Sequence, residues 1–224
     1  IIAWKKADNG SEPDGYLIND KYLENAGTTP GDWYPIALGR LGIQDNNEGY
    51  LAVIKDRVEE RYRESGRLSA AKATEWHRIA LAVLAMGGDP TNFGTDENGA
   101  PINLIADGTY DRGKTTPLGR QGINGWIWGL ITLDSMRYAV PDGAYNTRDD
   151  IIVEIISKQL SDGGFALSSD DADPDITAMA ITALAPYYNS EKIYSYHRKA
   201  LSADESKTVH EVVDEAVLCL SRLQ

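Results

Sequence analysis

The chain has 224 residues, with 22 lysines and arginines against 34 aspartates and glutamates, which gives a formal net charge of −12. This excess of negative charge disfavours binding to nucleic acid or to an anionic membrane surface, because both would repel the chain. No apolar run approaches the ~18 residues of a membrane-spanning helix. The single cysteine, Cys219, excludes an internal disulfide, and its aliphatic neighbours are typical of a core position.

Helical periodicity dominates the chain, since apolar residues recur at spacings of three and four. In chain order it predicts helices over 53–65, 72–86, 125–138, 148–160, 175–188 and 209–223. Turn-rich stretches lie between helices at 87–99, 108–122 and 162–174, and the alternation typical of strands is scarce. The length fits one domain over 1–224, and the pattern predicts an all-α fold.

A repeated pattern predicts four equivalent helices. Each has a polar residue, a small residue five positions later and a leucine four positions after that. The polar residues are Asp32, Glu75, Asn124 and Asp175; the small ones are Ala37, Ala80, Gly129 and Ala180; the leucines are Leu41, Leu84, Leu133 and Leu184. The starts are 43, 49 and 51 residues apart, about the length of a helical hairpin with its loops. The small residue and the leucine share one helix face, so a neighbouring helix can approach closely there.

The stretch 159–165, QLSDGGF, resembles the repeat motif of squalene cyclases, oxidosqualene cyclases and protein prenyltransferase β-subunits. The stretches 31–42, 74–94, 122–138 and 173–188 are similar to repeats of bacterial secreted or cell-surface proteins of this kind. The resemblance implies an α/α toroid of helical hairpins with inner and outer layers. It also implies an exported, extracellular or cell-surface location.

The chain holds four of the six inner helices that a closed ring of this family contains. Gln224 ends where another glycine turn is expected, so we expect an incomplete ring that stops before its last repeats. The chain begins at Ile1 with no leader-like segment, which predicts a processed or excised piece.

Asp173 and Asp175 are the catalytic candidates that the resemblance supplies. Cyclases that protonate their substrate carry a DxDDTA-like motif, and 173–178 matches it with Asp175 at the acid position. Ile176 replaces the neighbouring aspartate that helps to tune such an acid. An aspartate between a proline loop and a helix is also a typical helix cap, and we favour that interpretation.

Metal binding has little support in the sequence. His77, His197, His210 and Cys219 show no metal-ligand spacing, so we predict no zinc site. Oxygen ligands in the loops at 96–99 and 170–175 suit calcium, although neither matches a twelve-residue calcium loop. Apart from this calcium hypothesis, we expect no cofactor.

Aromatic side chains near the starts of the inner helices suit an apolar, carbohydrate or corrin-like ligand. The predicted ligand-binding residues are Trp76, His77, Asn124, Trp126 and Trp128. Transcobalamin-like proteins share the scaffold, which makes cobalamin one candidate ligand.

The sequence therefore favours a non-catalytic domain that binds a small molecule, a protein or a glycan. The alternative is a terpenoid-cyclase-like or prenyltransferase-like enzyme that uses Asp175 as general acid.

Overall fold

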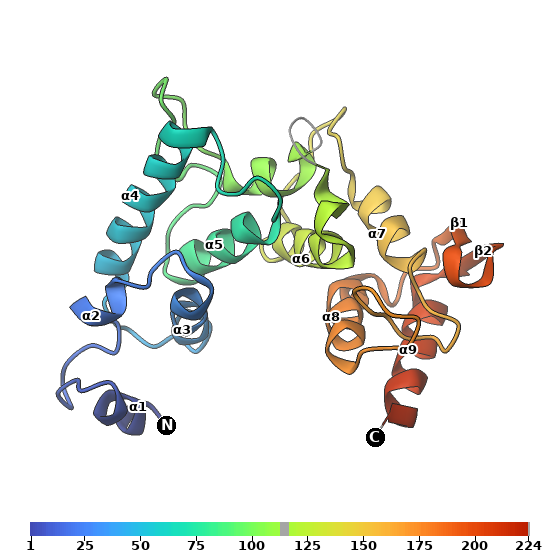
Figure 1. Cartoon of the computed structure of the whole chain (residues 1–224), viewed down its shortest axis with the longest axis horizontal. Coiled ribbons are helices and arrows are strands. Elements are labelled where there is room, and N and C mark those ends of the chain that lie inside the picture. The colour runs from blue at the N-terminus through green and yellow to red at the C-terminus, as the bar shows by residue number, and fades with distance from the viewer. Residues whose placement is uncertain (113–116, 224) are drawn as a thin grey trace. The chain divides into compact units, whose positions relative to one another are not determined.

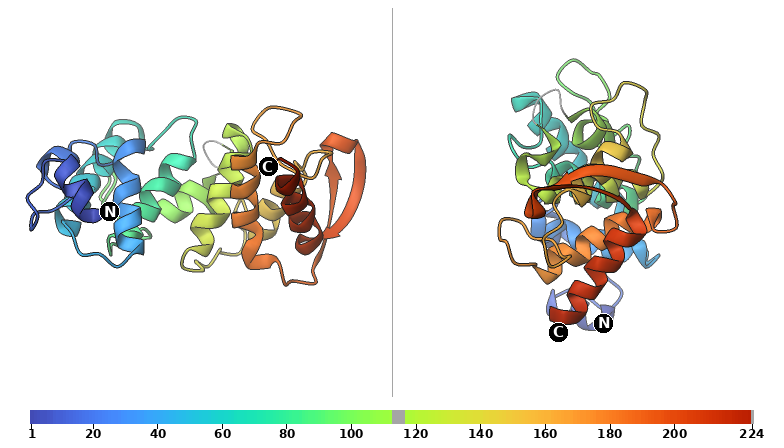
Figure 2. Two further views of the ribbon diagram at one scale, coloured as in Figure 1. Left: turned by 90° about the horizontal axis from the view of Figure 1, so that it is seen from below. Right: turned by 90° about the vertical axis from the view of Figure 1, so that its right-hand side faces the viewer.

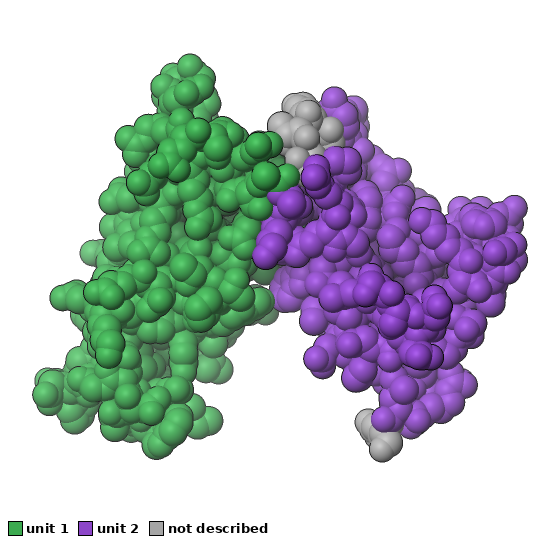
Figure 3. Space-filling model, viewed as in Figure 1, with its two compact units in different colours: residues 1–70, 75–107 green, residues 71–74, 108–224 purple. Residues whose placement is uncertain are grey.

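A computed structural model describes residues 1–112 and 117–223, and these are mostly helical (Figure 1). The chain divides into two compact units, which Figure 3 colours separately. Unit 1 comprises residues 1–70 and 75–107, and unit 2 comprises residues 71–74 and those from 108 onward. The helical prediction is confirmed, whereas the toroid, its missing repeats and the single domain stay predictions. Gln224 lies outside the described residues, as do 113–116 of the turn-rich stretch 108–122.

Unit 1 is built from short and long helices in the first half of the chain. They are α1 (Ile2–Asp8), α2 (Asp20–Leu23), α3 (Thr29–Arg40), α4 (Asn47–Ser65) and α5 (Thr74–Ala85), the last belonging to this unit from Glu75 onward. A single turn of π-helix, Ala106–Tyr110, follows. In α4 every fourth residue from Tyr50 to Tyr62 is buried, which places one face of the helix in the core. The helix ends at Gly66, whose φ of 63° suits a left-handed cap.

A buried ion pair fixes α3, α4 and α5 together. Asp32 is fully buried, and its carboxylate accepts hydrogen bonds from Arg78 Nε and from the Tyr50 hydroxyl, both at 2.8 Å. The guanidinium of Arg78 also donates to both carboxylate oxygens of Glu75, at 2.8 and 2.9 Å. Burial raises the pKa of the Asp32 carboxyl, and the hydrogen bonds from Arg78 and Tyr50 offset part of that rise. Leaving one such charge buried without its partner costs about 3–5 kcal/mol, so the pair holds the three helices in place.

Close packing of α3 against α5 occurs at Gly39, because a Cβ there would overlap the Ala85 carbonyl oxygen. The repeat pattern predicts Ala37 as the small residue of this contact. Ala37 is instead exposed, and Leu41 is 71% exposed. The predicted face is therefore not the packed face of α3.

Unit 2 contains most of the second half of the chain. Its elements are a 3₁₀ turn (Leu118–Gln121), α6 (Ile123–Asp134), α7 (Arg148–Ile156), α8 (Pro174–Leu184), a 3₁₀ turn (Ala185–Tyr187), β1 (Ile193–Arg198), a 3₁₀ turn (Lys199–Leu201), β2 (Ala203–Thr208) and α9 (Val209–Leu223). α6 packs on α7 and α8, and α8 packs on α9. The predicted small-residue pattern holds here, since Gly129, Leu133, Ala180 and Leu184 are all buried.

The helix ends differ from the predicted ones for local reasons. α6 stops at Asp134, and Arg137 soon afterwards has a left-handed φ of 53°. α8 gives way to a 3₁₀ turn at Ala185, because the next residue, Pro186, has no N–H to continue the helix.

One β-hairpin amends the all-α prediction. β1 and β2 pair antiparallel from Ile193 opposite Thr208 to Arg198 opposite Ala203. The hairpin runs beside α7 and α9 (Figure 2). Alternate residues of β1 are buried, namely Tyr194, Tyr196 and Arg198, so this segment carries the strand pattern that the sequence analysis missed.

Gly39→Ala should destabilise unit 1 by about 1–3 kcal/mol, because the added methyl overpacks the contact with Ala85. Ala37→Leu on the exposed face of the same helix should change the free energy of unfolding by less than about 0.5 kcal/mol. Urea denaturation of both variants measures the difference. Equal stability of the two variants would show that α3 and α5 do not depend on this close approach.

Candidate functional site

Asp173 and Asp175 both lie at the start of α8, but only Asp173 caps the helix. Asp173 is the N-cap, and its Oδ1 accepts the Ile176 N–H at 2.9 Å. Asp175 is the second residue of the helix, within its first turn, and is exposed to solvent. A general acid for a cyclase needs a dry, apolar setting, and an exposed carboxyl does not have one.

The QLSDGGF stretch forms a tight turn in which polar groups satisfy the backbone. Asp162 Oδ1 accepts the Gly164 N–H at 2.9 Å, and the fully buried Gln159 donates Nε2 to the carbonyls of Gly163 (2.8 Å) and Val212 (2.9 Å). The buried Thr177 hydroxyl accepts the Phe165 N–H at 2.9 Å, which joins the turn to α8. These contacts position the turn between α7, α8 and α9, so the motif acts structurally.

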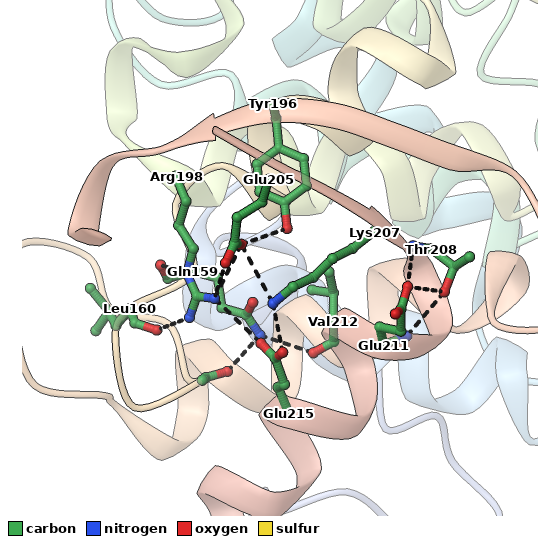
Figure 4. A network of polar contacts seen from close by, with 11 residues as sticks. Gln159, Leu160, Tyr196, Arg198, Glu205, Lys207, Thr208, Glu211, Val212 and Glu215 are labelled. Carbon is green, nitrogen blue, oxygen red and sulfur yellow. Dashed lines mark hydrogen bonds and ion pairs between the residues drawn. The ribbon is translucent and has the colours of Figure 1, made fainter. Parts of the chain in front are cut away.

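Arg198 of the hairpin extends this arrangement (Figure 4). Its guanidinium donates Nε to the Gln159 carbonyl at 3.0 Å and Nη2 to the Leu160 carbonyl. Nη1 lies 3.3 Å from Glu205 and 3.4 Å from Glu215. The side chain of Arg198 is only 4% exposed, so it neutralises a largely buried set of acceptors where α7 leads into the turn.

Trp76 and His77, two of the predicted ligand-binding residues, lie in the core of unit 1. Trp76 is 2% exposed and donates its indole N–H to the Tyr62 hydroxyl at 2.8 Å, and that hydroxyl donates to Asp107 at 2.7 Å. His77 is fully buried in the same helix, α5. Neither side chain faces solvent.

Asn124, Trp126 and Trp128 lie in the first turns of α6 and are half-buried. The Trp126 indole packs against Gly119, where a Cβ would leave no room for it. The Asn124 amide oxygen is buried and has no hydrogen-bond partner among residues 1–112 and 117–223. These three residues share a helix of unit 2, whereas Trp76 and His77 belong to unit 1.

A concave pocket in unit 1 has the side-chain chemistry of a ligand site. It encloses about 120 Å³ beside α1, α2 and α3. The side chains around it are Lys5, Asp8, Asn9, Leu17, Ile18, Tyr22 and Tyr34. Residues 1–34 hold five aromatic side chains, and this density is the sequence signal that would have pointed to the pocket.

Contacts among its side chains hold the pocket in shape. The rings of Tyr22 and Tyr34 meet edge to face with centroids 5.6 Å apart, and the Tyr22 hydroxyl donates to the Gly31 carbonyl at 2.9 Å. Lys5 pairs with Asp8 at 2.9 Å, and its ammonium lies 5.5 Å from the centre of the Tyr34 ring. Hydrogen bonding to Tyr34 and to Asp8 raises the pKa of Lys5.

No cluster of three metal-ligating side chains occurs in the described ranges. At 96–99, Asp96 Oδ1 accepts the N–H groups of Asn98 and Ala100, at 2.8 and 2.9 Å, as in an ordinary turn. Calcium binding at this loop or at 170–175 stays a prediction. Within the same described residues, no helix is long and apolar enough to cross a membrane.

Comparison with protein-family models, with curated proteins and with solved structures gave no significant match.

Asp173→Ala should lower the free energy of unfolding by about 1 kcal/mol, because α8 loses its cap. Asp175→Ala should cost less than about 0.5 kcal/mol, since the exposed carboxylate contributes only through the helix dipole. Thermal denaturation of the two variants distinguishes them. A larger loss from the Asp175 substitution would contradict the assignment of the cap.

Arg198→Met should destabilise unit 2 by more than about 2 kcal/mol, because it leaves the carbonyls of Gln159 and Leu160 without their buried donor and removes one of the partners of Glu205. Lys199→Met is the matched control, since that neighbouring side chain is exposed. Hydrogen exchange at the amides of 160–165 reports the turn directly. Unchanged protection of these amides in Arg198→Met would show that the hairpin does not support the turn.

Proposed function

We propose that the chain is a non-catalytic domain of an extracytoplasmic bacterial protein that binds a ligand or partner. We further propose an α/α-toroid scaffold for it, similar to that of terpenoid cyclases. The resemblance of 159–165 and the net charge of −12 support the scaffold and the location outside the cytoplasm. The mostly helical structure of the described residues is compatible with this scaffold.

The pocket of unit 1 is the observation that carries the binding proposal. It is lined by aliphatic, aromatic and charged residues, which is the composition of small-molecule sites. Its volume of about 120 Å³ is well below the roughly 300–1,000 Å³ of pockets for drug-sized ligands. A corrin or a polyprenoid therefore does not fit inside it, and a small group of a larger ligand does.

The state of the candidate carboxylates supports a non-catalytic role. The Asp173 carboxylate accepts a hydrogen bond from a backbone N–H, and the Asp175 carboxylate is exposed to solvent. Asp162 of the glycine turn is also bound to backbone N–H groups. These three carboxylates thus have structural or solvated roles, and the motif offers the cyclase alternative no buried acid among them.

The proposal is tested by measuring both binding and turnover with wild type and Asp175→Asn. Calorimetric titration with cell-wall glycans, peptides and cobalamin should detect a ligand, and Asp175→Asn should bind it with unchanged affinity. Neither protein should convert squalene, because Asp175, the acid that the cyclase alternative requires, is exposed to solvent. Turnover of squalene by wild type that disappears in a folded Asp175→Asn variant would establish the cyclase alternative instead.

A further inference from the structure

One face of α3 is exposed although it carries the pattern that forms buried packing faces in two other helices. In α6 the small residue, Gly129, is covered by a neighbouring segment, since a Cβ there would lie 3.3 Å from Leu118 Cδ2. The small residue and the leucine of α8 are buried as well. In α3 the corresponding residues, Ala37 and Leu41, are both exposed, Leu41 by 71%. α3 therefore presents to solvent a face of the kind that packs against a further segment in α6 and α8.

The exposed face of α3 is a row of apolar side chains with a small residue at its centre. Trp33, which is 43% exposed, stands four residues before Ala37, and Leu41 stands four residues after it. Residues at this spacing form one ridge on a helix. Tryptophan is among the residue types enriched where a few side chains dominate a binding energy. A row of exposed apolar side chains that includes a tryptophan is therefore typical of an interaction surface.

The order large, small, large makes this ridge complementary to itself. In the commonest class of helix packing, such ridges run parallel and the helix axes cross at about 50°. A twofold axis that passes beside Ala37 exchanges the residues before it with the residues after it, so Trp33 of one copy covers Leu41 of the partner subunit. The small side chain of Ala37 lets the two helices approach closely at the centre. A contact between two identical surfaces needs this kind of self-complementarity.

The charges of α3 permit a second copy to approach there. The chain has a formal net charge of −12, so two copies repel each other unless they meet where carboxylates are absent. α3, all of whose residues are described, contains one acidic side chain, Asp32, and that carboxylate is buried and paired with Arg78. Its one other charged residue, Arg40, is exposed and basic. The face of α3 thus brings no carboxylate of its own against a second copy, and it lacks the negative charge that would attract a basic partner.

We propose that the chain self-associates through the exposed face of α3, formed by Trp33, Ala37 and Leu41, against the same face of a second copy across a twofold axis. A contact centred on one helix buries less than the roughly 800 Å² per partner of a standard interface, so the dimer is a weak one. This inference goes beyond the proposed ligand-binding function and does not depend on it.

Sedimentation equilibrium of the full chain between about 5 and 500 μM tests the inference. Wild type should form a dimer with a Kd on the order of 100 μM, as expected for a small contact. Leu41→Glu should raise that Kd at least about tenfold, because it places two carboxylates in the apolar contact. Leu218→Glu is the matched control, since Leu218 is a leucine of α9 in unit 2 that is 57% exposed, and it should leave the Kd unchanged. Both variants should fold, because both side chains are exposed, and circular dichroism checks this.

Single cysteines test the register of the two copies. Ala37→Cys lies next to the twofold axis, so its thiol and that of the second copy should come within reach of a disulfide, whose Cβ atoms are about 3.5–4.5 Å apart. Oxidised glutathione, which accepts the two electrons, should therefore link this variant into covalent dimers. Trp33→Cys should not link to itself but should link to Leu41→Cys in an equimolar mixture. Met136→Cys, at an exposed position of unit 2, should stay unlinked, and the native Cys219 is buried.

A wild-type chain that stays monomeric up to about 500 μM would overturn the inference. So would a dimer that Leu41→Glu leaves intact, or that Leu218→Glu disrupts to the same extent, because the contact would then lie elsewhere. Faster linking of Leu41→Cys to itself than of Ala37→Cys to itself would overturn the twofold register. Ligand titration is independent of these results: if wild type stays monomeric but binds a ligand, this inference fails and the proposed binding function stands.

Discussion

The packing of the helices depends on glycines at points where neighbouring segments approach so closely that no side chain fits between them. At the turn before α8, a Cβ on Gly163 would lie 2.7 Å from the Glu215 carbonyl oxygen, and one on Gly164 would lie 2.9 Å from Cys219 Sγ. Gly39 imposes the same condition on α3 and α5. Because overpacking of this kind destabilises a protein by about 1–3 kcal/mol, the approach of α3 to α5 and of the turn to α9 depends on glycine at these positions.

The polar side chains near these glycines make hydrogen bonds that stabilise the fold, so they have a structural role. In the turn of 159–165, the side chains of Gln159 and Asp162 bond to backbone groups. Arg198 supplies the charge that the remaining carbonyls and acidic groups need. A catalytic acid must exchange its proton, whereas these groups are stabilising only while their hydrogen bonds stay in place. A binding site needs only a concave surface with rigid walls, and the pocket beside Tyr34 provides one at a distance in sequence from the motif.

The sequence predicts the helices well because their burial is periodic. It predicts the start of α8 but assigns the cap to Asp175 instead of Asp173, since both aspartates flank Pro174 and only the backbone geometry distinguishes them. Asp32 looks like a cap in the repeat pattern, yet its partner Arg78 lies 46 residues away, and such a pairing has no local signal. The pocket of unit 1 is missed for a different reason, because its lining residues lie in short helices and a loop that the repeat pattern does not describe.

The hairpin interrupts the series of helices between α8 and α9, and helix resumes directly after it. α7 and α9 begin with the same reciprocal cap, Thr147 with Asp150 and Thr208 with Glu211. The chain thus returns to helix immediately after β2. Arg198 and Tyr194 then anchor the addition, the first on the carbonyls beyond α7 and the second on Asp149 at 3.0 Å. These two contacts tie the hairpin to both ends of α7, so the strands add to the core of unit 2 instead of standing apart from it.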